Sequence, residues 1–391
     1  MPAASHISAP RIVLTGGGTG GHVYPALAVA AALGELKPRA RLFFVGGDRL
    51  EARLAPAAGL PFRRISVHGL VGRGLSQAPR RARALAELAL GLPLLQSLAA
   101  LRRFRPQLVI GTGGYVSGPV LLAARLLRVP CLALEGNCAP GWTTCAVARM
   151  VDAIAVAHSE MAEFFACRVR KGARVVITGL PVRQQIVTLS RETGATALGL
   201  DPALTTLLAL GGSLGSRRMN EALVGALNLL GRSPARLDAV QVLHVTGERY
   251  AQPSTQRECE FLPPNYRSIA YLGSRYPESL AAADLVISRA GASTLAELTA
   301  RGVPAVLIPW SGAAAGEQDL NAAPLARAGA AIVIPDRELG AERLARTLDE
   351  LLGNNEKLER MARASRALGK PRAARDVAAL ALQLAERRTP A

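Results

Sequence analysis

Short apolar runs, rich in leucine and β-branched residues, alternate along the chain with longer segments whose apolar positions recur every three or four residues. This alternation predicts parallel strands joined by crossover helices, and so an α/β fold. The first half holds seven strand candidates: residues 11–15, 41–45, 62–66, 107–110, 131–134, 153–157 and 174–178. The second half holds six: residues 205–210, 240–246, 268–272, 285–288, 305–308 and 330–334. We therefore expect two doubly wound, Rossmann-like domains that follow one another along the chain.

The pattern restarts after Gly179-Leu180-Pro181, which predicts a boundary near residue 180. A chain of 391 residues is long enough for two domains, each with its own core. We expect residues 1–180 and 181–370 to form these domains, with the glycine-rich loops of both on the walls of a deep cleft. Residues 371–388 read as one amphipathic helix, so the tail 371–391 is expected to pack back across the domains.

Cysteine usage and hydropathy predict a cytosolic chain. The five cysteines form no C-x-x-C pair, and the chain opens without a basic segment followed by an apolar run. The longest apolar stretch, residues 84–101, contains Glu87, Pro93 and Gln96. Because such residues are poorly suited to a bilayer-crossing helix, we expect no membrane span.

Charge is concentrated in the first half of the chain. Residues 1–180 hold 22 Lys and Arg against 8 Asp and Glu, and so carry most of the net charge of +18. The densest basic stretch, residues 63–105, is interleaved with leucines and has few aromatic residues for base stacking. This pattern favours an anionic membrane surface over nucleic acid. An arginine-rich composition with solvated helix faces explains the same charges.

Three glycine-rich turns each follow a predicted strand: residues 16–21, 111–119 and 211–216. A side-chain-poor loop at the start of a helix exposes main-chain N–H groups, which suit a phosphate. The first and third turns lack the Gly-Lys-Ser or Gly-Lys-Thr ending of a P-loop and the acid of a dinucleotide fingerprint. Tight packing alone also explains a single such turn, but three in one chain favour phosphate binding.

Two residues at helix starts have competing interpretations. His22 is a candidate general base, since the positive end of a helix keeps an imidazole neutral, but a hydrogen bond that stabilises the loop explains it equally well. Thr294-Leu295-Ala296-Glu297 fits a capping box. A carboxylate on the first turn is also placed to accept hydrogen bonds from the two hydroxyls of a ribose.

Polar residues that suit a sugar phosphate follow two other strands. Glu135 and Asn137 come directly after a strand, where a carboxylate and a carboxamide can hold sugar hydroxyls and acetamides, although a turn explains the same residues. Arg183 is a candidate phosphate ligand or a surface residue of the linker. The chain has no Asp-x-Asp and no His-x-x-x-His, so a bound divalent metal is not indicated.

Several segments together resemble the MurG family of bacterial glycosyltransferases in order and spacing. The resemblance runs from about residue 11 to residue 370. It is carried by Gly17-Gly18-Thr19-Gly20-Gly21-His22, Gly113-Gly114-Tyr115-Val116-Ser117-Gly118-Pro119, Gly211-Gly212-Ser213, Arg289-Ala290-Gly291-Ala292-Ser293-Thr294-Leu295-Ala296-Glu297, and Gln318 with Asn321-Ala322.

The resemblance implies a GT-B fold and assigns roles to matching residues. It implies donor contacts at Thr19, Gly20 and Gly21, sugar contacts at Asn137 and Gln318, and diphosphate contacts at Arg183 and Ser213. The main chain of Leu272 would meet the uracil. The ribose and diphosphate would be wrapped by Ala292, Ser293, Thr294, Leu295, Ala296 and Glu297, with Glu297 on the ribose hydroxyls.

The resemblance also implies an activity. It implies inverting transfer of N-acetylglucosamine from UDP-N-acetylglucosamine to undecaprenyl-diphospho-N-acetylmuramoyl-pentapeptide, in peptidoglycan synthesis and thereby in cell shape and division. We expect His22 as general base, with Glu135 as its partner or substitute, and neither a metal nor a cofactor. The implied location is the cytoplasmic face of the membrane, bound peripherally through the N-terminal domain, with other cell-wall enzymes as further partners.

The chain departs from the family pattern at Leu134-Glu135-Gly136-Asn137, at Gly179-Leu180-Pro181-Val182-Arg183 and at residues 311–317. These segments belong to the expected sugar and acceptor sites, so UDP binding is the firmer prediction. Three alternatives stay open: a GT-B transferase for another acceptor, a UDP-N-acetylglucosamine 2-epimerase, and a non-catalytic UDP-sugar-binding paralogue. Nucleic-acid binding is supported by charge alone, and we expect none.

Overall fold

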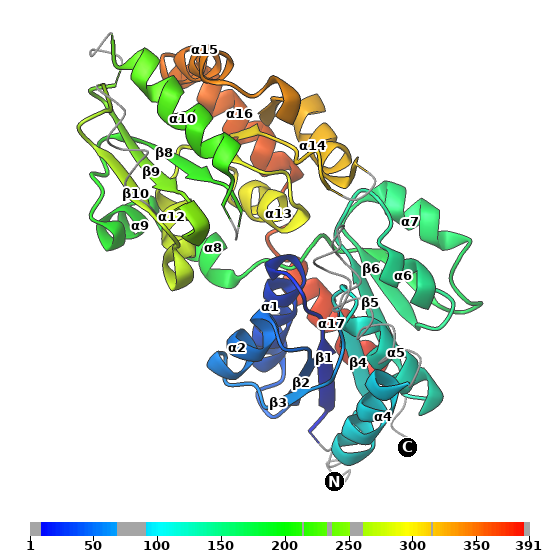
Figure 1. The fold of residues 1–391 in the computed structure, drawn as a ribbon. Helices are drawn as coiled ribbons and strands as arrows, with labels where there is room; N and C mark the ends of the chain where they lie inside the picture. Colours follow the sequence, from blue (N-terminus) through cyan, green and yellow to red (C-terminus); the bar gives the residue numbers. More distant parts are fainter. Residues whose placement is uncertain are drawn as a thin grey trace, which may run out of the picture. The chain divides into compact units, whose positions relative to one another are not determined.

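The computed structural model describes residues 9–68, 91–212, 215–232, 237–250, 261–313 and 316–386 (Figure 1). It divides into two compact units. Unit 1 comprises Met1–Arg183 with Arg372–Ala391, and unit 2 comprises Gln184–Pro371. Each unit contains one parallel sheet with helices on both faces, which confirms the predicted α/β class.

The sheet of unit 1 has seven parallel strands in the order β3-β2-β1-β4-β5-β6-β7. Their bounds are β1 (Arg11–Thr15), β2 (Arg41–Gly46), β3 (Phe62–Arg64), β4 (Leu108–Gly111), β5 (Cys131–Glu135), β6 (Ala153–Val156) and β7 (Arg174–Ile177). The strand order reverses direction between β1 and β4, where Thr15 pairs with Gly111. Ligands of open parallel sheets bind at such a switch point. The loops that follow β1 and β4 therefore start side by side.

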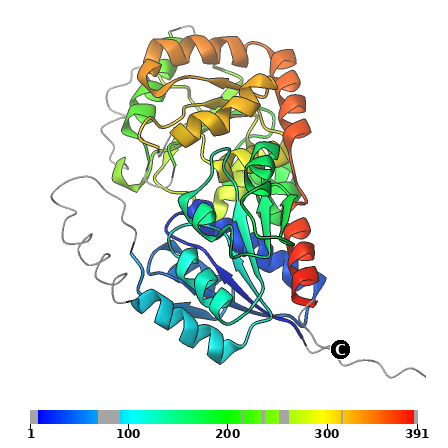
Figure 2. The same ribbon diagram turned by 90° about the vertical axis from the view of Figure 1, so that its right-hand side faces the viewer.

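Seven described helices surround this sheet: α1 (Gly20–Leu36), α2 (Leu50–Ala57), α4 (Leu92–Phe104), α5 (Ser117–Leu126), α6 (Trp142–Val147), α7 (Ser159–Ala166) and α17 (Ala373–Glu386). One core lies under α4 and α5, and a second lies under α1 and α17. The C-terminal α17 packs directly on α1, as Figure 2 shows for the red and blue helices. The end of the chain thus completes the core that its first helix begins.

The sheet of unit 2 has six parallel strands in the order β10-β9-β8-β11-β12-β13. Their bounds are β8 (Thr205–Leu210), β9 (Val240–Val245), β10 (Tyr266–Ile269), β11 (Leu285–Ser288), β12 (Ala305–Leu307) and β13 (Ala331–Val333). The helices are α8 (Gln184–Thr188), α9 (Arg191–Leu198), α10 (Arg217–Leu230), α12 (Tyr276–Ala282), α13 (Ala292–Arg301), α14 (Glu317–Arg327), α15 (Ala341–Leu352) and α16 (Asn355–Leu368). Here the switch point lies between β8 and β11.

All thirteen predicted strands are present, with one shift of position. The strand predicted at residues 268–272 is β10, which ends at Ile269. The main chain leaves the sheet there because Leu272 starts a 3-10 turn (Gly273–Arg275), in which the Arg275 N–H donates to the Leu272 carbonyl. The apolar residue at 272 is buried in the core of unit 2 rather than in the strand.

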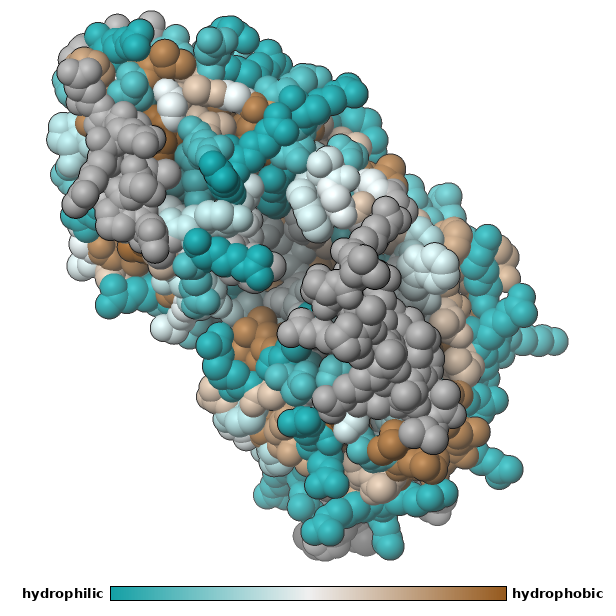
Figure 3. Space-filling view, in the orientation of Figure 1, coloured by the Kyte–Doolittle hydropathy of each residue, from teal (hydrophilic) through white to brown (hydrophobic). Residues whose placement is uncertain are grey.

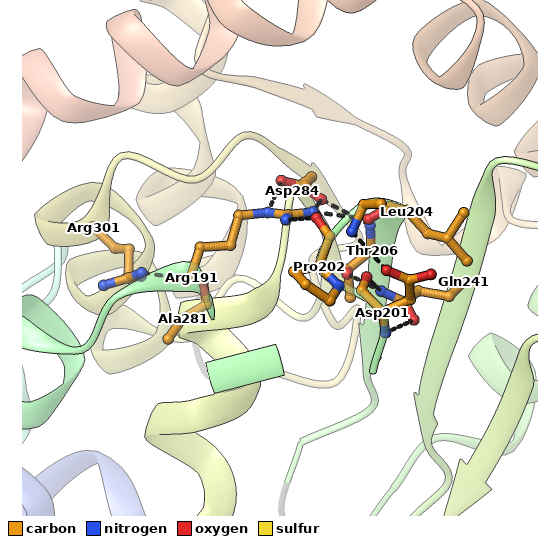
Figure 4. Close-up of polar contacts among 10 residues, drawn as sticks. Arg191, Asp201, Pro202, Leu204, Thr206, Gln241, Ala281, Asp284 and Arg301 are labelled. Carbon is orange, nitrogen blue, oxygen red and sulfur yellow. Dashed lines mark hydrogen bonds and ion pairs between the residues drawn. The ribbon is translucent and has the colours of Figure 1, made fainter. Parts of the chain in front are cut away.

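A network of polar contacts joins the amino ends of the unit 2 strands, at the opposite end of the sheet from the loops that follow the strands (Figure 4). The guanidinium of Arg191 donates to both carboxylate oxygens of Asp284. Asp284 also accepts from the Thr206 N–H, so α9, β8 and β11 share one anchor. Arg301 donates to the carbonyls of Ile186 and Leu189, which ties α8 to the end of α13.

In the described part of the chain, no helix is long and apolar enough to cross a membrane.

Candidate functional site

The loops that follow β1 and β4 are joined through His22. His22 is the third residue of α1, which begins directly after the glycine-rich loop of residues 16–19, here called loop 1. The Thr112 hydroxyl, at the start of the loop after β4, donates a 2.7 Å hydrogen bond to the His22 carbonyl. The Thr112 N–H donates to the Thr15 carbonyl at 2.8 Å. A single residue, Thr112, which directly follows β4, therefore holds both ends of loop 1.

The His22 imidazole is held in one orientation and one tautomer. Its Nδ1 atom lies 3.1 Å from the Thr112 carbonyl oxygen. A carbonyl only accepts, so Nδ1 carries the hydrogen, and Nε2 has the lone pair in the neutral ring. Burial lowers the pKa of His22, while the Thr112 hydrogen bond and the negative charge of Glu51 act in the opposite direction. Burial, rather than the helix dipole that the prediction invoked, is the largest influence on the pKa of His22.

Two glycines after β4 make room for this ring. A Cβ atom on Gly113 would lie 2.7 Å from His22 Nδ1. A Cβ on Gly114 would lie 2.3 Å from the Gly17 carbonyl oxygen, and both glycines have positive φ angles of 105° and 75°. Such a conformation is readily adopted only by glycine. The second glycine-rich turn is thus required for packing against loop 1 and His22.

The Glu135 carboxylate is buried at the end of β5 and is occupied by its own loop. It accepts hydrogen bonds from the Asn137 N–H at 3.1 Å, the Asn137 side-chain amide at 3.3 Å and the Gly141 N–H at 2.8 Å. Burial raises the pKa of Glu135, although hydrogen bonds from Gly141, Asn137 and Thr144 oppose that shift. This carboxylate shapes the loop that carries Asn137.

Arg183 lies beside the start of α1. Its guanidinium carbon is 4.3 Å above the ring centre of Tyr24, and a Cβ on Gly20 would lie 3.2 Å from that same ring. A cation over an aromatic face at this distance is an attractive contact. The structure thus brings Arg183 onto the side of α1 beside Tyr24, which also contacts Gly20.

In unit 2, Arg289 links the loops that follow β8, β11, β12 and β13. Its guanidinium donates to the Ser216 hydroxyl at 2.9 Å, to the Ile308 carbonyl at 3.2 Å and to the Asp336 carboxylate at 2.7 Å. Ser216 is the N-cap of α10 and accepts from the Met219 N–H. Burial would raise the pKa of Asp336, but hydrogen bonds from Arg289 and Ser311 and nearby positive charge lower it below its ordinary value.

The predicted capping box at Thr294 and Glu297 is wrong. The helix α13 starts at Ala292 with Gly291 as its N-cap, so Thr294 is its third residue and Glu297 its sixth. Glu297 therefore lies on the second turn, not on the first as the ribose hypothesis also assumed. Its carboxylate is buried and accepts a 2.9 Å hydrogen bond from the Tyr276 hydroxyl.

Two side chains from α14 hold the main chain at the start of α13. The Gln318 side-chain oxygen accepts from the Ala290 N–H at 3.2 Å and from the Trp310 N–H at 2.9 Å. The Asn321 side-chain amide donates to the Ala290 carbonyl at 3.4 Å. Since the oxygen of Gln318 is used in this way, its amide group is the end that suits a sugar.

The predicted residues form two groups, one in each unit. Unit 1 holds Thr19, Gly20, Gly21, His22, Glu135, Asn137 and Arg183, and unit 2 holds Leu272, Ala292, Ser293, Thr294, Leu295, Ala296, Glu297 and Gln318. Ser213 and most of the basic stretch, residues 69–90, lie outside the described residues. The predicted roles of these residues stay predictions.

Sequence reasoning missed three residues that shape the two groups. Glu51 is fully buried below loop 1, Asp336 pairs with Arg289, and Tyr276 donates to Glu297. Glu51 stands just after Gly46-Gly47-Asp48, a turn directly after a strand, and that position was a usable signal. Asp336 likewise follows a predicted strand, but no local pattern marks its partner Arg289, which is 47 residues away, or that of Tyr276, which is 21 residues away.

Solved structures share the fold of two parallel, doubly wound domains. MurG from Acinetobacter baumannii is 27% identical with a TM-score of 0.70, covering 96% of this chain and 99% of that chain. A putative UDP-N-acetylglucosamine 2-epimerase from Listeria monocytogenes is 15% identical with a TM-score of 0.66, over 98% of each chain, and shows the fold alone. The fold is that of the GT-B class of glycosyltransferases and their structural relatives.

Family models narrow this class. Residues 12–156 match the glycosyltransferase family 28 N-terminal domain, and residues 206–377 match the glycosyltransferase family 28 C-terminal domain. The chain belongs to glycosyltransferase family 28. It is 42% identical to a Moorella thermoacetica protein named UDP-N-acetylglucosamine--N-acetylmuramyl-(pentapeptide) pyrophosphoryl-undecaprenol N-acetylglucosamine transferase, over 96% of this chain and 99% of that protein. The comparisons confirm the resemblance to the MurG family.

Proposed function

We propose that this chain transfers N-acetylglucosamine from UDP-N-acetylglucosamine to an undecaprenyl-diphospho-N-acetylmuramoyl-pentapeptide acceptor in peptidoglycan synthesis. The observation that carries the proposal is the match of 42% identity, over nearly the full length of both chains, to a relative of that name. The two glycine-rich switch points described above supply groups that suit such substrates.

The donor is assigned to unit 2. The first turn of a helix leaves main-chain N–H groups outside the helical ladder, and the positive end of its dipole favours an anion. In α13 the ladder begins with the Leu295 N–H bonded to the Gly291 carbonyl, and Arg289 ties the N-cap of α10 to the adjoining loop. We assign the UDP diphosphate to these two helix starts, the ribose to Glu297 and the sugar to Gln318.

The acceptor hydroxyl is assigned to His22. In the proposed step the hydroxyl oxygen attacks the anomeric carbon, the bond from that carbon to the UDP oxygen breaks, and Nε2 of His22 takes the hydroxyl proton. The fixed Nδ1 hydrogen and the lowered pKa of His22 keep Nε2 able to accept a proton at neutral pH. Because the Glu135 oxygens already accept several hydrogen bonds, we assign Glu135 to positioning Asn137 rather than to proton transfer.

A membrane-facing role is assigned to α4 and α5, which pack against each other in unit 1. Leu95 and Leu126 are 61% and 58% exposed on these helices. The same helices also carry exposed arginines, Arg102 and Arg103 on α4 and Arg125 on α5. Apolar surface is visible in this region in Figure 3. Exposed leucines among arginines suit an anionic bilayer surface. We assign this surface to peripheral binding on the cytoplasmic face, where other cell-wall enzymes are further partners.

A transfer assay tests the proposed activity. Radiolabelled UDP-N-acetylglucosamine and a short-chain undecaprenyl-type acceptor are incubated with the full chain, with and without a metal chelator. Transfer of label to the lipid, with His22→Ala as a folded negative control, is the expected result. Absence of transfer by well-folded wild-type protein overturns the proposal.

The same preparation separates the alternatives. A changed sugar formed without acceptor indicates an epimerase. Thermal stabilisation by UDP-N-acetylglucosamine without turnover indicates a non-catalytic paralogue. Vesicle sedimentation tests the membrane surface. The wild-type chain is expected to sediment with anionic but not with neutral vesicles. Leu95→Glu is expected to lose this binding, and the exposed control Arg39→Glu is expected to keep it. Filter binding to nucleic acid is expected to be negligible at moderate salt.

A further inference from the structure

Glu51 is a charged side chain with no solvent exposure, on the first turn of α2. Its Oε2 atom accepts from the Gly18 N–H in loop 1 and its Oε1 atom accepts from the Gly47 N–H after β2, both at 3.1 Å. Carboxylates are almost never fully buried unless their oxygens have partners, because desolvation is costly. One carboxylate thus bridges the loops after two neighbouring strands.

Glycines form the walls of the Glu51 site. A Cβ on Gly17 would lie 2.5 Å from the carboxylate carbon of Glu51, and a Cβ on Gly47 would lie 2.8 Å from Oε1. A Cβ on Gly46 would lie 2.8 Å from Cγ of the same side chain. Loop 1 therefore has a glycine at position 17 to receive this carboxylate. The space left by these three glycines is filled by the side chain and carboxylate oxygens of Glu51.

The carboxylate also acts on His22. Burial has the largest effect on the pKa of His22 and lowers it. The hydrogen bond to the Thr112 carbonyl raises this pKa, and the negative charge of Glu51 raises it further by a smaller amount. Other charged or titratable groups nearby are Tyr115, which a Cβ on Gly18 would contact, and Arg183, which stacks on Tyr24 of the same helix. Glu51 accepts a hydrogen bond from the Gly18 N–H of loop 1 and carries a negative charge.

We propose that Glu51 is a positioning residue for the transfer reaction, fixing loop 1 and supplying the negative charge that balances the imidazolium formed when His22 takes the proton. The proposal rests on the proposed role of His22 as base. It assigns Glu51 no contact with substrate. A buried carboxylate at fixed distance stabilises a developing cation without reorganising during the reaction.

The test compares three variants of the full chain. Glu51→Gln removes the charge and keeps the side-chain shape, and Glu51→Asp keeps the charge and shortens the side chain. Asp48→Asn is the matched control, since it removes an exposed negative charge from the same loop. Circular dichroism and thermal melting establish that each variant is folded.

The first readout needs no activity. Imidazole NMR titration follows the five histidines, with His22→Ala assigning the His22 signal. The pKa of His22 is expected to fall from wild type to Glu51→Asp and further to Glu51→Gln, and to stay unchanged in Asp48→Asn. An unchanged His22 titration in folded Glu51→Gln overturns the proposal, and if that variant does not fold, an unchanged titration in Glu51→Asp does so.

The second readout is kinetic. Glu51→Gln is expected to lower kcat by about tenfold and to shift the acid limb of the pH profile to lower pH. The change in KM for the donor is expected to be smaller. In a His22→Ala background the same substitution is expected to have little further effect on kcat. A change in KM alone, equal in both backgrounds, indicates a purely structural carboxylate and overturns the proposal. If wild-type protein transfers no sugar, the proposed function fails, while the titration still tests the coupling of Glu51 to His22.

Discussion

Thr112 and His22 hold each other by their side chains and main chains across 90 residues of sequence. The Thr112 hydroxyl donates to the His22 carbonyl at 2.7 Å, and the His22 Nδ1–H donates to the Thr112 carbonyl at 3.1 Å. This reciprocal pair joins the loops after β1 and β4 at the switch point of the sheet. It sets both the position of α1 and the tautomer of the imidazole.

Thr112→Val tests this pair. Valine has the same shape but no hydroxyl, so the partly buried carbonyl of His22 loses one donor. We expect the free energy of unfolding to fall by about 1–2 kcal/mol and kcat to fall by roughly tenfold, because the imidazole is less well fixed. Urea unfolding and steady-state transfer rates measure the two effects. Wild-type kcat in a destabilised but folded Thr112→Val protein contradicts the positioning role.

The transfer rate is expected to fall in acid only below pH 6.5. A protonated His22 has no lone pair on Nε2, so the rate falls as the pH drops through the pKa of His22, which burial lowers below its ordinary value. Above that pKa the rate stays on a plateau. The profile of kcat/KM against pH measures this, with His22→Ala expected to be slower by about 10²- to 10⁴-fold and to lack that limb. A limb centred above pH 6.5 excludes His22 as the group observed.

The Arg289–Asp336 pair is expected to matter for both stability and donor binding. The two side chains are only 14% and 11% exposed, and breaking a pair that is largely removed from water costs about 3 kcal/mol. We expect Asp336→Asn to lower stability and to raise KM for the donor, since Arg289 also orients Ser216. The exposed ion pair of Arg217 and Glu221 offers the control Glu221→Gln, with little change expected.

The pH dependence of the Asp336 contribution follows from the same pair. Its folded pKa lies below its unfolded value, so the stabilisation is complete above the ordinary carboxyl pKa and is lost as the pH falls through the folded pKa. The difference in unfolding free energy between wild type and Asp336→Asn should therefore shrink in acid. A difference that grows as the pH falls contradicts this linkage.

His244 is expected to make unit 2 less stable in mild acid. The imidazole is buried between the Tyr266 hydroxyl at 2.8 Å and the Asn220 side-chain oxygen at 3.0 Å, and burial lowers its pKa to about 4. A folded pKa below the unfolded value means that stability is complete above pH 6.5 and declines as the pH falls toward 4. The loss amounts to roughly 3 kcal/mol.

The His244 prediction is checked by unfolding free energies measured across that pH range. His244→Gln is expected to remove most of this slope, whereas the partly exposed His68→Gln keeps it. If the unfolding free energy of His244→Gln depends on pH as strongly as that of the wild type, the acid sensitivity belongs to other groups.

Much of the fold was readable from the sequence because strand and helix patterns depend on local burial. The apolar runs gave all thirteen strands, since the inner strands lie within sheets covered on both faces and need apolar residues on both sides, whereas the edge strands β3, β7 and β10 are only partly buried. The position of β10 was missed by about two residues because the apolar residues 270–272 continue the pattern while the main chain turns away. Periodicity records burial and does not record where a strand leaves its ladder.

The candidate site was readable only in part. Glycine-rich turns after strands pointed to the right loops, because close main-chain approach requires glycine at positions such as Gly113 and Gly114. The capping box at Glu297 was wrong because the first residue of α13 depends on the end of β11 and on the Gly291 cap. A four-residue motif cannot show at which turn of a helix it stands.

The sequence by itself determined the α/β class, the strands and the glycine-rich loops, because these follow from local hydrophobic pattern and main-chain freedom. Only the tertiary structure decided the partners: Thr112 with His22, Glu51 with Gly18, and Arg289 with Asp336. These contacts join residues between 33 and 90 positions apart, and they exist because parallel strands place their carboxyl ends together. The burial of Glu51 and the lowered pKa of His22 follow from that arrangement.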